Sequence, residues 1–154
     1  MDEIDRNIVV ALQQDGSSGL AELAKVAGLS VSATAERVKR LEERGVIRAW
    51  RADLDPAAVG CPLLAHVLAT VAPGRDDQAF RDALRREEAV LECHAVTGPW
   101  SYLLKLRVAD LPALDTFLNE SLRALPGVQR LETMVALATV KESAILPVAP
   151  ATDE

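Results

Sequence analysis

The chain contains few aromatic residues, and this scarcity limits what its cores can be made of. Aromatic side chains make up 3% of the 154 residues, whereas the hydrophobic class as a whole makes up 49%. The cores must therefore be built mainly from Leu, Val, Ile and Ala. With 26% charged residues, the composition is that of a globular protein and excludes disorder for most of the chain.

Cysteine and histidine are also scarce, with two of each, and this disfavours several kinds of reactive site. Cys61 and Cys93 form no spacing motif, which favours reduced thiols over a disulfide or a redox pair. Together with the two histidines they would make a poor zinc site. Cys93 and His94 are neighbours on an expected strand, so they point to opposite faces and cannot act together as nucleophile and base. We expect no metal, no cofactor and no catalytic residue, and therefore no enzyme.

Long apolar runs are absent as well. No stretch reaches the roughly 18 apolar residues that are needed to cross a bilayer. The sequence begins Met1-Asp2-Glu3, and this charge is wrong for a secretory signal peptide. We expect a cytoplasmic protein with no membrane partner.

Positive charge is concentrated in one short segment of an acidic protein. The formal net charge is -6, which by itself argues against a nucleic-acid partner. Residues 37–51, however, contain six basic and two acidic residues, a net charge of +4, whereas residues 1–36 carry a net charge of −4. The distribution of charge therefore favours a local binding surface for an anionic partner.

Three short helices fit within the first 45 residues. Apolar residues recur at helical spacing from Ile4 to Leu12, and a second helical stripe ends at Gly28. Ser30 can cap a third helix, which ends at Gly45. Residues 46–54 have the pattern of a short strand, and we expect this strand to be a small wing. The inward stripe of the third helix is expected to be Val31, Ala35, Val38 and Leu41.

The second half of the chain alternates between strand and helix patterns. Strands are predicted at 63–72, 90–97, 101–108 and 128–140, and helices at 76–88 and 111–125. The order βαββαβ is that of a ferredoxin-like domain, so the fold class is α+β. The predicted parts are a winged helix-turn-helix domain at 1–55, a linker at 56–62, a ferredoxin-like domain at 63–143 and a C-terminal tail at 144–154, loose after Pro147.

The third helix has the two faces that a groove-binding helix needs. In a helix-turn-helix, the second helix of the motif lies in the major groove of double-stranded DNA. Small side chains in its first turn can approach base edges, while arginines reach guanine or phosphate. The alternative, a merely solvated helix face, is weakened by the combination of three helices, a glycine at the turn and a basic wing. We expect Arg37 and Arg40 to contribute most. The predicted contacts are Ser30, Ser32, Ala33, Thr34, Arg37, Lys39, Arg40, Arg48 and Arg51.

Several motifs occur in a fixed order from about residue 1 to residue 143. In the first half they are Met1-Asp2-Glu3-Ile4-Asp5-Arg6-Asn7-Ile8, Leu23-Ala24-Lys25-Val26-Ala27-Gly28-Leu29-Ser30 and Glu36-Arg37-Val38-Lys39-Arg40-Leu41-Glu42-Glu43-Arg44-Gly45-Val46-Ile47. In the second half they are Glu92-Cys93-His94, Val96-Thr97-Gly98, Tyr102-Leu103-Leu104-Lys105 and Leu125-Pro126-Gly127-Val128. This set resembles the Lrp/AsnC, or feast/famine, transcriptional regulators.

The resemblance implies a winged helix-turn-helix joined to a domain that oligomerises and binds a small-molecule effector. It implies homodimers formed by sheet-to-sheet packing and often assembled into octamers, with an amino acid or related metabolite as effector. The effector would lie between subunits, near the hairpin and the last strand. The residues so implied are Gly98, Pro99, Trp100, Ser101, Tyr102, Thr133, Met134 and Val135.

The hairpin departs from the family pattern at two positions. The family has acidic residues after the glycine and just before the tyrosine, where this chain has Pro99 and Ser101. A carboxylate is the natural partner of an ammonium group, so the expected pocket prefers an aromatic, aliphatic or weakly cationic metabolite over lysine or arginine. The same loss also suits an alternative function, an architectural DNA-binding protein without an effector.

Overall fold

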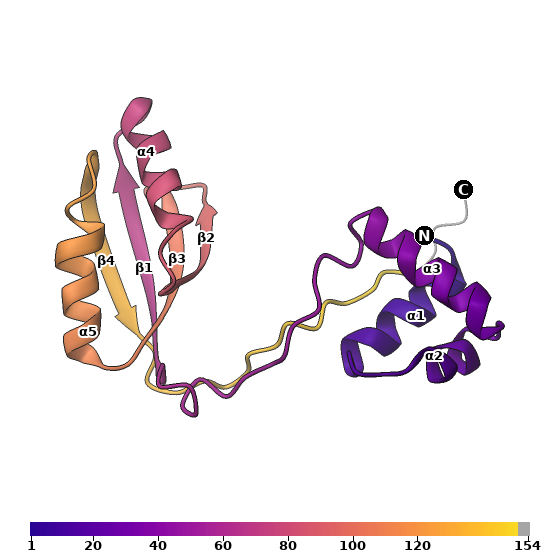
Figure 1. The fold of residues 1–154 in the computed structure, drawn as a ribbon. Helices are drawn as coiled ribbons and strands as arrows, with labels where there is room; N and C mark the ends of the chain where they lie inside the picture. The colour runs from indigo at the N-terminus through magenta and orange to yellow at the C-terminus, as the bar shows by residue number, and fades with distance from the viewer. Residues whose placement is uncertain (151–154) are drawn as a thin grey trace. The chain divides into compact units, whose positions relative to one another are not determined.

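The computed structural model describes residues 1–150 and divides the chain into two units (Figure 1). The first unit is Met1–Asp53 together with the segment that begins at Lys141, and the second is Leu54–Val140. Each unit has a hydrophobic core of its own. The predicted tail therefore belongs to the first unit as far as residue 150, and its last four residues lie outside the described part.

The first unit contains three helices, α1 (Glu3–Gln14), α2 (Leu20–Ala27) and α3 (Val31–Glu43). Polar side chains begin two of them. Asp2 accepts a hydrogen bond from the Asp5 amide at the start of α1, and Ser30 accepts one from the Ala33 amide at the start of α3. Both contacts satisfy amides that have no partner inside the helix. The core of the unit is formed by Ile8, Ala27 and Leu41.

The segment after α3 does not form the predicted strand, so the expectation of a β-stranded wing is wrong. Residues 46–54 contain no strand, and the amides of Val46 and Ile47 instead donate to the carbonyl of Leu41. The Trp50 indole donates to the Glu42 carboxylate at 2.7 Å. A strand needs a partner strand, and the described residues of this unit offer none.

The C-terminal segment makes a paired contact with the first helix. The side-chain amide of Gln13 donates to the carbonyl of Leu146 at 3.1 Å and accepts from the amide of the same residue at 2.7 Å. A primary amide that bonds both groups of one residue imitates a strand pairing. The segment from Lys141 is therefore attached to α1 just before Pro147.

The second unit has the predicted ferredoxin-like topology. The strands β1 (Leu63–Val71), β2 (Val90–Ala95), β3 (Tyr102–Val108) and β4 (Val128–Val135) form one antiparallel sheet in the order β2-β3-β1-β4. The helix α4 (Arg75–Leu84) follows β1. The helix α5 (Leu111–Thr116) continues as a π-helical turn, η1 (Phe117–Leu122), before β4. The last strand ends at 135 rather than 140 because its pairing with β1 ends near the first residue of β1.

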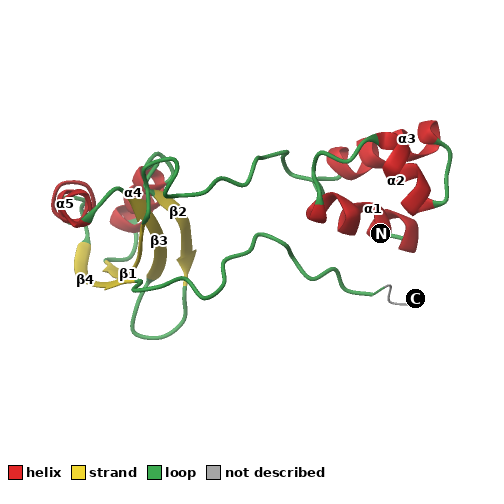
Figure 2. Ribbon diagram, turned by 90° about the horizontal axis from the view of Figure 1, so that it is seen from below, coloured by secondary structure: helices red, strands yellow, loops and turns green. Residues whose placement is uncertain are grey.

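The sheet has one covered and one uncovered face. Along β1, Ala65, Val67 and Ala69 are fully buried and face the helices, whereas the residues between them are half-buried. The covered face packs against Phe80 of α4 and Leu122 of η1, among others, and Figures 1 and 2 show both helices flanking the sheet. We call the opposite side the open face; on β1 it consists of Leu64, His66, Leu68 and Thr70.

The described helices do not suggest a membrane segment. Within residues 1–150, no helix combines the length and the apolar character that crossing a bilayer requires.

A close backbone approach at Gly127 provides a test of the second unit's packing. Gly127 has φ +79°, and an added Cβ would lie 2.4 Å from the Cβ of Asp76. Gly60 has nearly the same φ, +82°, with no atom within 4 Å of an added Cβ. A left-handed conformation costs a non-glycine residue about 1–2 kcal/mol, and overpacking adds about 1–3 kcal/mol. We therefore expect Gly127→Ala to lower the free energy of unfolding clearly more than Gly60→Ala.

Urea unfolding of a Trp50→Phe background, followed by the emission of Trp100, measures this difference within one unit. Equal losses from the two substitutions would mean that the contact between Gly127 and Asp76 is not tight in solution.

Candidate functional sites

The outer side of α3 presents four of the nine residues predicted to contact DNA. Ser32 and Ala33 are exposed in its first turn, and Lys39 and Arg40 are exposed further along. Lys39 makes a long ion pair of 3.7 Å with Glu43, and both side chains are more than half exposed. Ser30 is exposed at the cap, and Arg48 and Arg51 are exposed in the segment after the helix.

Thr34 is not available to DNA, so its assignment as a contact residue is wrong. Its exposure is 0%, and its hydroxyl donates to the carbonyl of Ser30 at 3.0 Å. The helix is rotated from the predicted orientation, because the inward stripe passes through Thr34 and Leu41, while Val31 is 48% exposed. The internal hydrogen bond removes most of the penalty for burying a hydroxyl.

Arg37 also lies elsewhere than predicted. Its guanidinium bonds the carboxylates of Asp2 and Asp5, both at 2.7 Å, and its side chain is 22% exposed. Asp5 belongs to α1 and Asp2 caps that helix, so one side chain of α3 holds the beginning of α1. The expectation that Arg37 points freely outward is wrong, because two acidic residues more than 30 positions earlier in the chain pair with it.

The electrostatics of this contact favour the charged forms. The pKa of Asp2 is lowered, first by the hydrogen bond that its carboxylate accepts from the Asp5 amide and then by the hydrogen bond from Arg37. The pKa of Arg37 is raised by its hydrogen bonds to Asp2 and then Asp5. We call these three residues the N-terminal clamp.

A polar hollow of about 250 Å³ adjoins the clamp. The side chains of Arg40 and Arg44 help to line it, with Met1 and Leu41 among the others. Arg44 belongs to the basic segment of the sequence but not to the predicted contacts. Sequence reasoning could have included Arg44, because it directly follows the last residue of α3. A basic residue at the end of a helix, next to an exposed arginine, extends the same basic surface.

The hairpin between β2 and β3 is anchored to the end of β1. The amide of Ser101 donates to the carbonyl of Ala69 at 2.9 Å, and the Ser101 hydroxyl accepts from the amide of Val71 at 3.2 Å. The turn passes through Gly98 with φ +105°. These bonds fix the hairpin where the effector site is expected.

Trp100 packs against a cation that the sequence did not predict in this site. The guanidinium carbon of Arg130 lies 4.4 Å from the centre of the Trp100 ring, within the range of cation–π attraction. Arg130 also approaches Glu132 at 3.7 Å, with both side chains at least half exposed. The hairpin, which lacks the family's acidic residues at Pro99 and Ser101, is therefore next to a positive charge.

Tyr102 points into the domain. It is 3% exposed, and its hydroxyl donates to the carboxylate of Asp77 on α4. Burial, followed by this hydrogen bond, raises the pKa of Tyr102. The same hydrogen bond lowers the pKa of Asp77, with Arg81 as a further cause.

The two halves of the predicted effector site lie against different parts of β1. Thr133, Met134 and Val135 pair with Val67, His66 and Ala65 of β1. The hairpin contacts β1 at Ala69 and Val71, which lie two to six residues, or roughly 7–20 Å, further along the strand.

In the part of the chain that the structure describes, no group of three or more His, Cys, Asp or Glu side chains could hold a metal ion.

Comparison with known proteins places both units in one kind of regulator. Residues 1–42 match the AsnC-type helix-turn-helix domain, and residues 64–146 match the Lrp/AsnC ligand binding domain. The leucine-responsive regulatory protein of Escherichia coli (strain K12) is 42% identical over 145 residues, which cover 93% of this chain and 88% of that protein.

Solved structures agree with these matches. A Neisseria meningitidis transcriptional regulator in complex with L-Met superposes with a TM-score of 0.90 and 30% identity, covering 96% of both chains. The leucine response regulatory protein LrpA of Mycobacterium tuberculosis superposes with a TM-score of 0.81 and 40% identity, covering 92% of this chain and 96% of that one.

The N-terminal clamp predicts a loss of stability in acid. The pKa of Asp2 is lower in the folded chain than its ordinary value of 3.8. Its stabilising effect is therefore complete well above that pH and disappears as the pH falls through the lowered pKa. In Asp2→Asn the helix cap can remain while the ion pair is lost. We expect this variant to be less stable than the wild type at neutral pH and equally stable in acid.

Unfolding of a Trp100→Phe background, followed by Trp50 emission between about pH 2 and 7, measures the first unit alone. Glu3→Gln is the matched control, because it removes one exposed negative charge from the same helix end. If both substitutions changed stability with the same pH profile, the clamp would have no specific role.

Proposed function

The chain belongs to the Lrp/AsnC family of transcriptional regulators, and we propose that it reads DNA mainly through Arg40 and neighbouring residues of α3. An uncharged amino acid would alter this binding. The observation that carries the DNA-binding proposal is the exposed surface of α3, on which Ser32, Ala33, Lys39 and Arg40 lie together. The relatives are transcriptional regulators, and we propose no enzymatic activity. A regulator of this kind works where the DNA is, in the cytoplasm.

Arg40 is the strongest candidate for a base or phosphate contact. Arg37 is already bonded to two carboxylates, and Lys39 pairs weakly with Glu43. Three acidic residues of the same helix, Glu36, Glu42 and Glu43, are exposed and repel phosphate, so few cations carry the attraction. Arg37 acts instead as a positioning residue that sets α3 against α1.

Further basic groups extend the surface. Arg44 lies beside Arg40 at the polar hollow, and Arg48 and Arg51 are exposed in the following segment. None of these three needs to read bases, because phosphate contacts fix the position of a protein on the duplex.

A second copy of the chain fits the open face of the sheet. Leu64, Leu68 and Leu103 are half-buried on that face, and Met134 is exposed beside them. An antiparallel sheet commonly has one apolar face packed on the core and one polar face in contact with solvent. Apolar side chains on the second face therefore favour sheet-to-sheet packing in a homodimer. Assembly of dimers into an octamer, as the family implies, would join the hairpin of one subunit to the β4 residues of another.

The charge at the hairpin selects among effectors. Arg130 stacks on Trp100, and no acidic residue occurs from Gly98 to Tyr102. A guanidinium is a good partner for the carboxylate of an amino acid, whereas a second ammonium group would be repelled. The related Neisseria meningitidis regulator was solved with L-Met, which supports an uncharged apolar amino acid here.

Arg40→Ala should weaken DNA binding by about 1–3 kcal/mol if the side chain reads a base, or reduce the salt slope by about one if it meets a phosphate. Footprinting and binding isotherms at several salt concentrations measure both effects. A dimer should protect two half-sites whose centres are one or more helical turns apart, roughly 10 base pairs each.

The matched control is Arg75→Ala, which removes the same charge from the other unit. A chain with Arg40→Ala that folds normally and binds DNA as tightly as the control would disprove the assignment, and protection of a single half-site by a monomer would disprove the dimer.

Effector choice is tested with a Trp50→Phe variant, in which Trp100 alone reports. We expect methionine to change its emission and to bind at least about tenfold more tightly than lysine, because burying the second, side-chain ammonium group of lysine without a carboxylate partner is costly. Arg130→Gln should weaken methionine binding, whereas Arg123→Gln, an exposed arginine of the same unit, should not.

Two results would contradict this view. Equal or tighter binding of lysine would remove the preference for uncharged effectors. No response of emission or DNA affinity to any amino acid, with DNA binding intact, would favour an architectural protein without an effector.

A further inference from the structure

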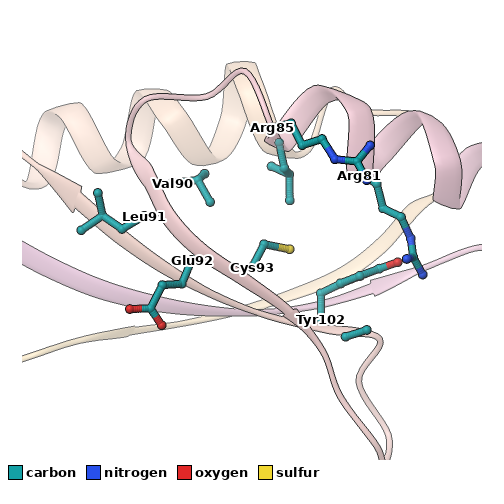
Figure 3. A pocket seen from close by; sticks show the side chains of 9 residues that line it. Arg81, Arg85, Val90, Leu91, Glu92, Cys93 and Tyr102 are labelled. Atoms are coloured by element: carbon teal, nitrogen blue, oxygen red, sulfur yellow. The ribbon is translucent and has the colours of Figure 1, made fainter. Parts of the chain in front are cut away.

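A cavity of about 350 Å³ lies between α4 and the edge strand β2, within a single protomer. Apart from Tyr102, its lining contains none of the residues proposed to bind the effector. Its apolar walls include Leu84, Val90 and Ala95, and Figure 3 shows the arrangement. Natural small-molecule pockets begin at about this size. If each non-hydrogen atom of a ligand occupies about 30 Å³, the volume of one water molecule in the liquid, the cavity holds a ligand of roughly ten such atoms.

Two arginines provide the charge of this cavity. Arg81 and Arg85 of α4 line it. Arg81 is held in position by an ion pair with Asp77 at 2.9 Å and by stacking over Tyr102, and Arg85 is paired with Asp82. A guanidinium has five N–H donors, so one contact to an aspartate leaves others to meet a ligand.

Glu92, the acidic residue of the lining, points away from the cavity (Figure 3). Figure 3 shows the Glu92 carboxylate directed away from Cys93 and the arginines. It approaches His94 at 3.1 Å and Lys105 at 3.4 Å, and Lys105 is its register partner on the open face. No lining carboxylate is therefore aimed at a ligand in the cavity, which leaves an ammonium group without a partner there.

Cys93 marks the floor of the cavity. It pairs with Leu104 in the sheet register, so its side chain is on the helix-covered face, and Figure 3 shows the sulfur directed toward the arginines. Burial raises the pKa of the Cys93 thiol, and the charge of Arg81 opposes this effect. The thiol is therefore protonated near neutral pH and adds an apolar, accessible group rather than an anion.

We propose that this cavity binds a small carboxylate with a short apolar body and no ammonium group, such as a branched 2-oxo acid. The carboxylate meets Arg85 and Arg81, and the hydrocarbon part lies against Leu84, Val90 and the Cys93 thiol. The proposal does not depend on the effector site at the hairpin, because the two sites share only Tyr102.

Protection of Cys93 from chemical modification tests the proposal in the full chain. A Cys61→Ser variant leaves one thiol, whose reaction rate with a maleimide is measured with and without 4-methyl-2-oxopentanoate. We expect the acid to slow the reaction at least about fivefold at saturation. Leucine has the same carbon skeleton with an ammonium group. Leucine and 3-methylbutylamine should each need at least about tenfold higher concentrations to give the same protection.

Two neighbouring arginines provide the matched variants. Arg85→Gln should weaken the binding of the oxo acid by about tenfold or more, as expected for the loss of a charge-assisted hydrogen bond. Arg86→Gln, which removes the same charge from an exposed residue outside the cavity lining, should leave binding unchanged. Calorimetry with Cys93→Phe, which fills the cavity, should detect no binding of the acid.

Several results would overturn the proposal. These are a thiol that does not react even without ligand, equal protection by the amine or by leucine, and unchanged affinity in Arg85→Gln. DNA binding of the same Cys61→Ser chain is measured in parallel. Normal DNA binding without protection by the acid would reject the cavity site alone, whereas loss of DNA binding in a folded chain would reject the proposed function.

Discussion

The alternation of side chains along β1 is the constraint on which the second unit depends. This strand pairs with both β3 and β4, so its register determines which residues of three strands face the helices. A shift by one residue would exchange the two faces completely. Ala69 and Val71 also hold the hairpin through Ser101. The positions of the β2–β3 hairpin, the covered core and the open face therefore follow from one strand.

In the first unit, acidic residues decide which basic residues are free to meet DNA. The basic segment has a net charge of +4, but the N-terminal clamp uses Arg37 to join α1 to α3. Two ion pairs shared by one guanidinium fix its direction better than a single pair does. We propose a division of roles on one helix, in which Arg37 orients the helix and Arg40, exposed near Arg44, attracts the DNA.

The sequence predicted the elements of the fold well, because helical and strand periods are local properties. The rotation of α3 could not be found in this way, since Val31 and Ala35 offered an apolar stripe that looked as suitable as the one through Thr34. The buried threonine is tolerated because its hydroxyl bonds the carbonyl of Ser30, and hydropathy does not register that bond. The clamp and the stack of Trp100 on Arg130 join residues about 30 or more positions apart, so no local pattern contains them.

A continuous series of contacts joins the hairpin to the α4–β2 cavity. Ser101 is bonded to β1, its neighbour Tyr102 donates to Asp77, and Asp77 pairs with Arg81, which lines the cavity. Contact alone does not couple two sites, because a ligand shifts an equilibrium only by its difference in affinity for the two states. If Asp77 moves when either site is filled, however, each ligand must change the affinity of the other by the same factor. Asp77 and Tyr102 are the residues through which such coupling would pass, since Asp77 is bonded both to the hairpin strand and to a wall of the cavity, and the Tyr102 ring lies in both sites.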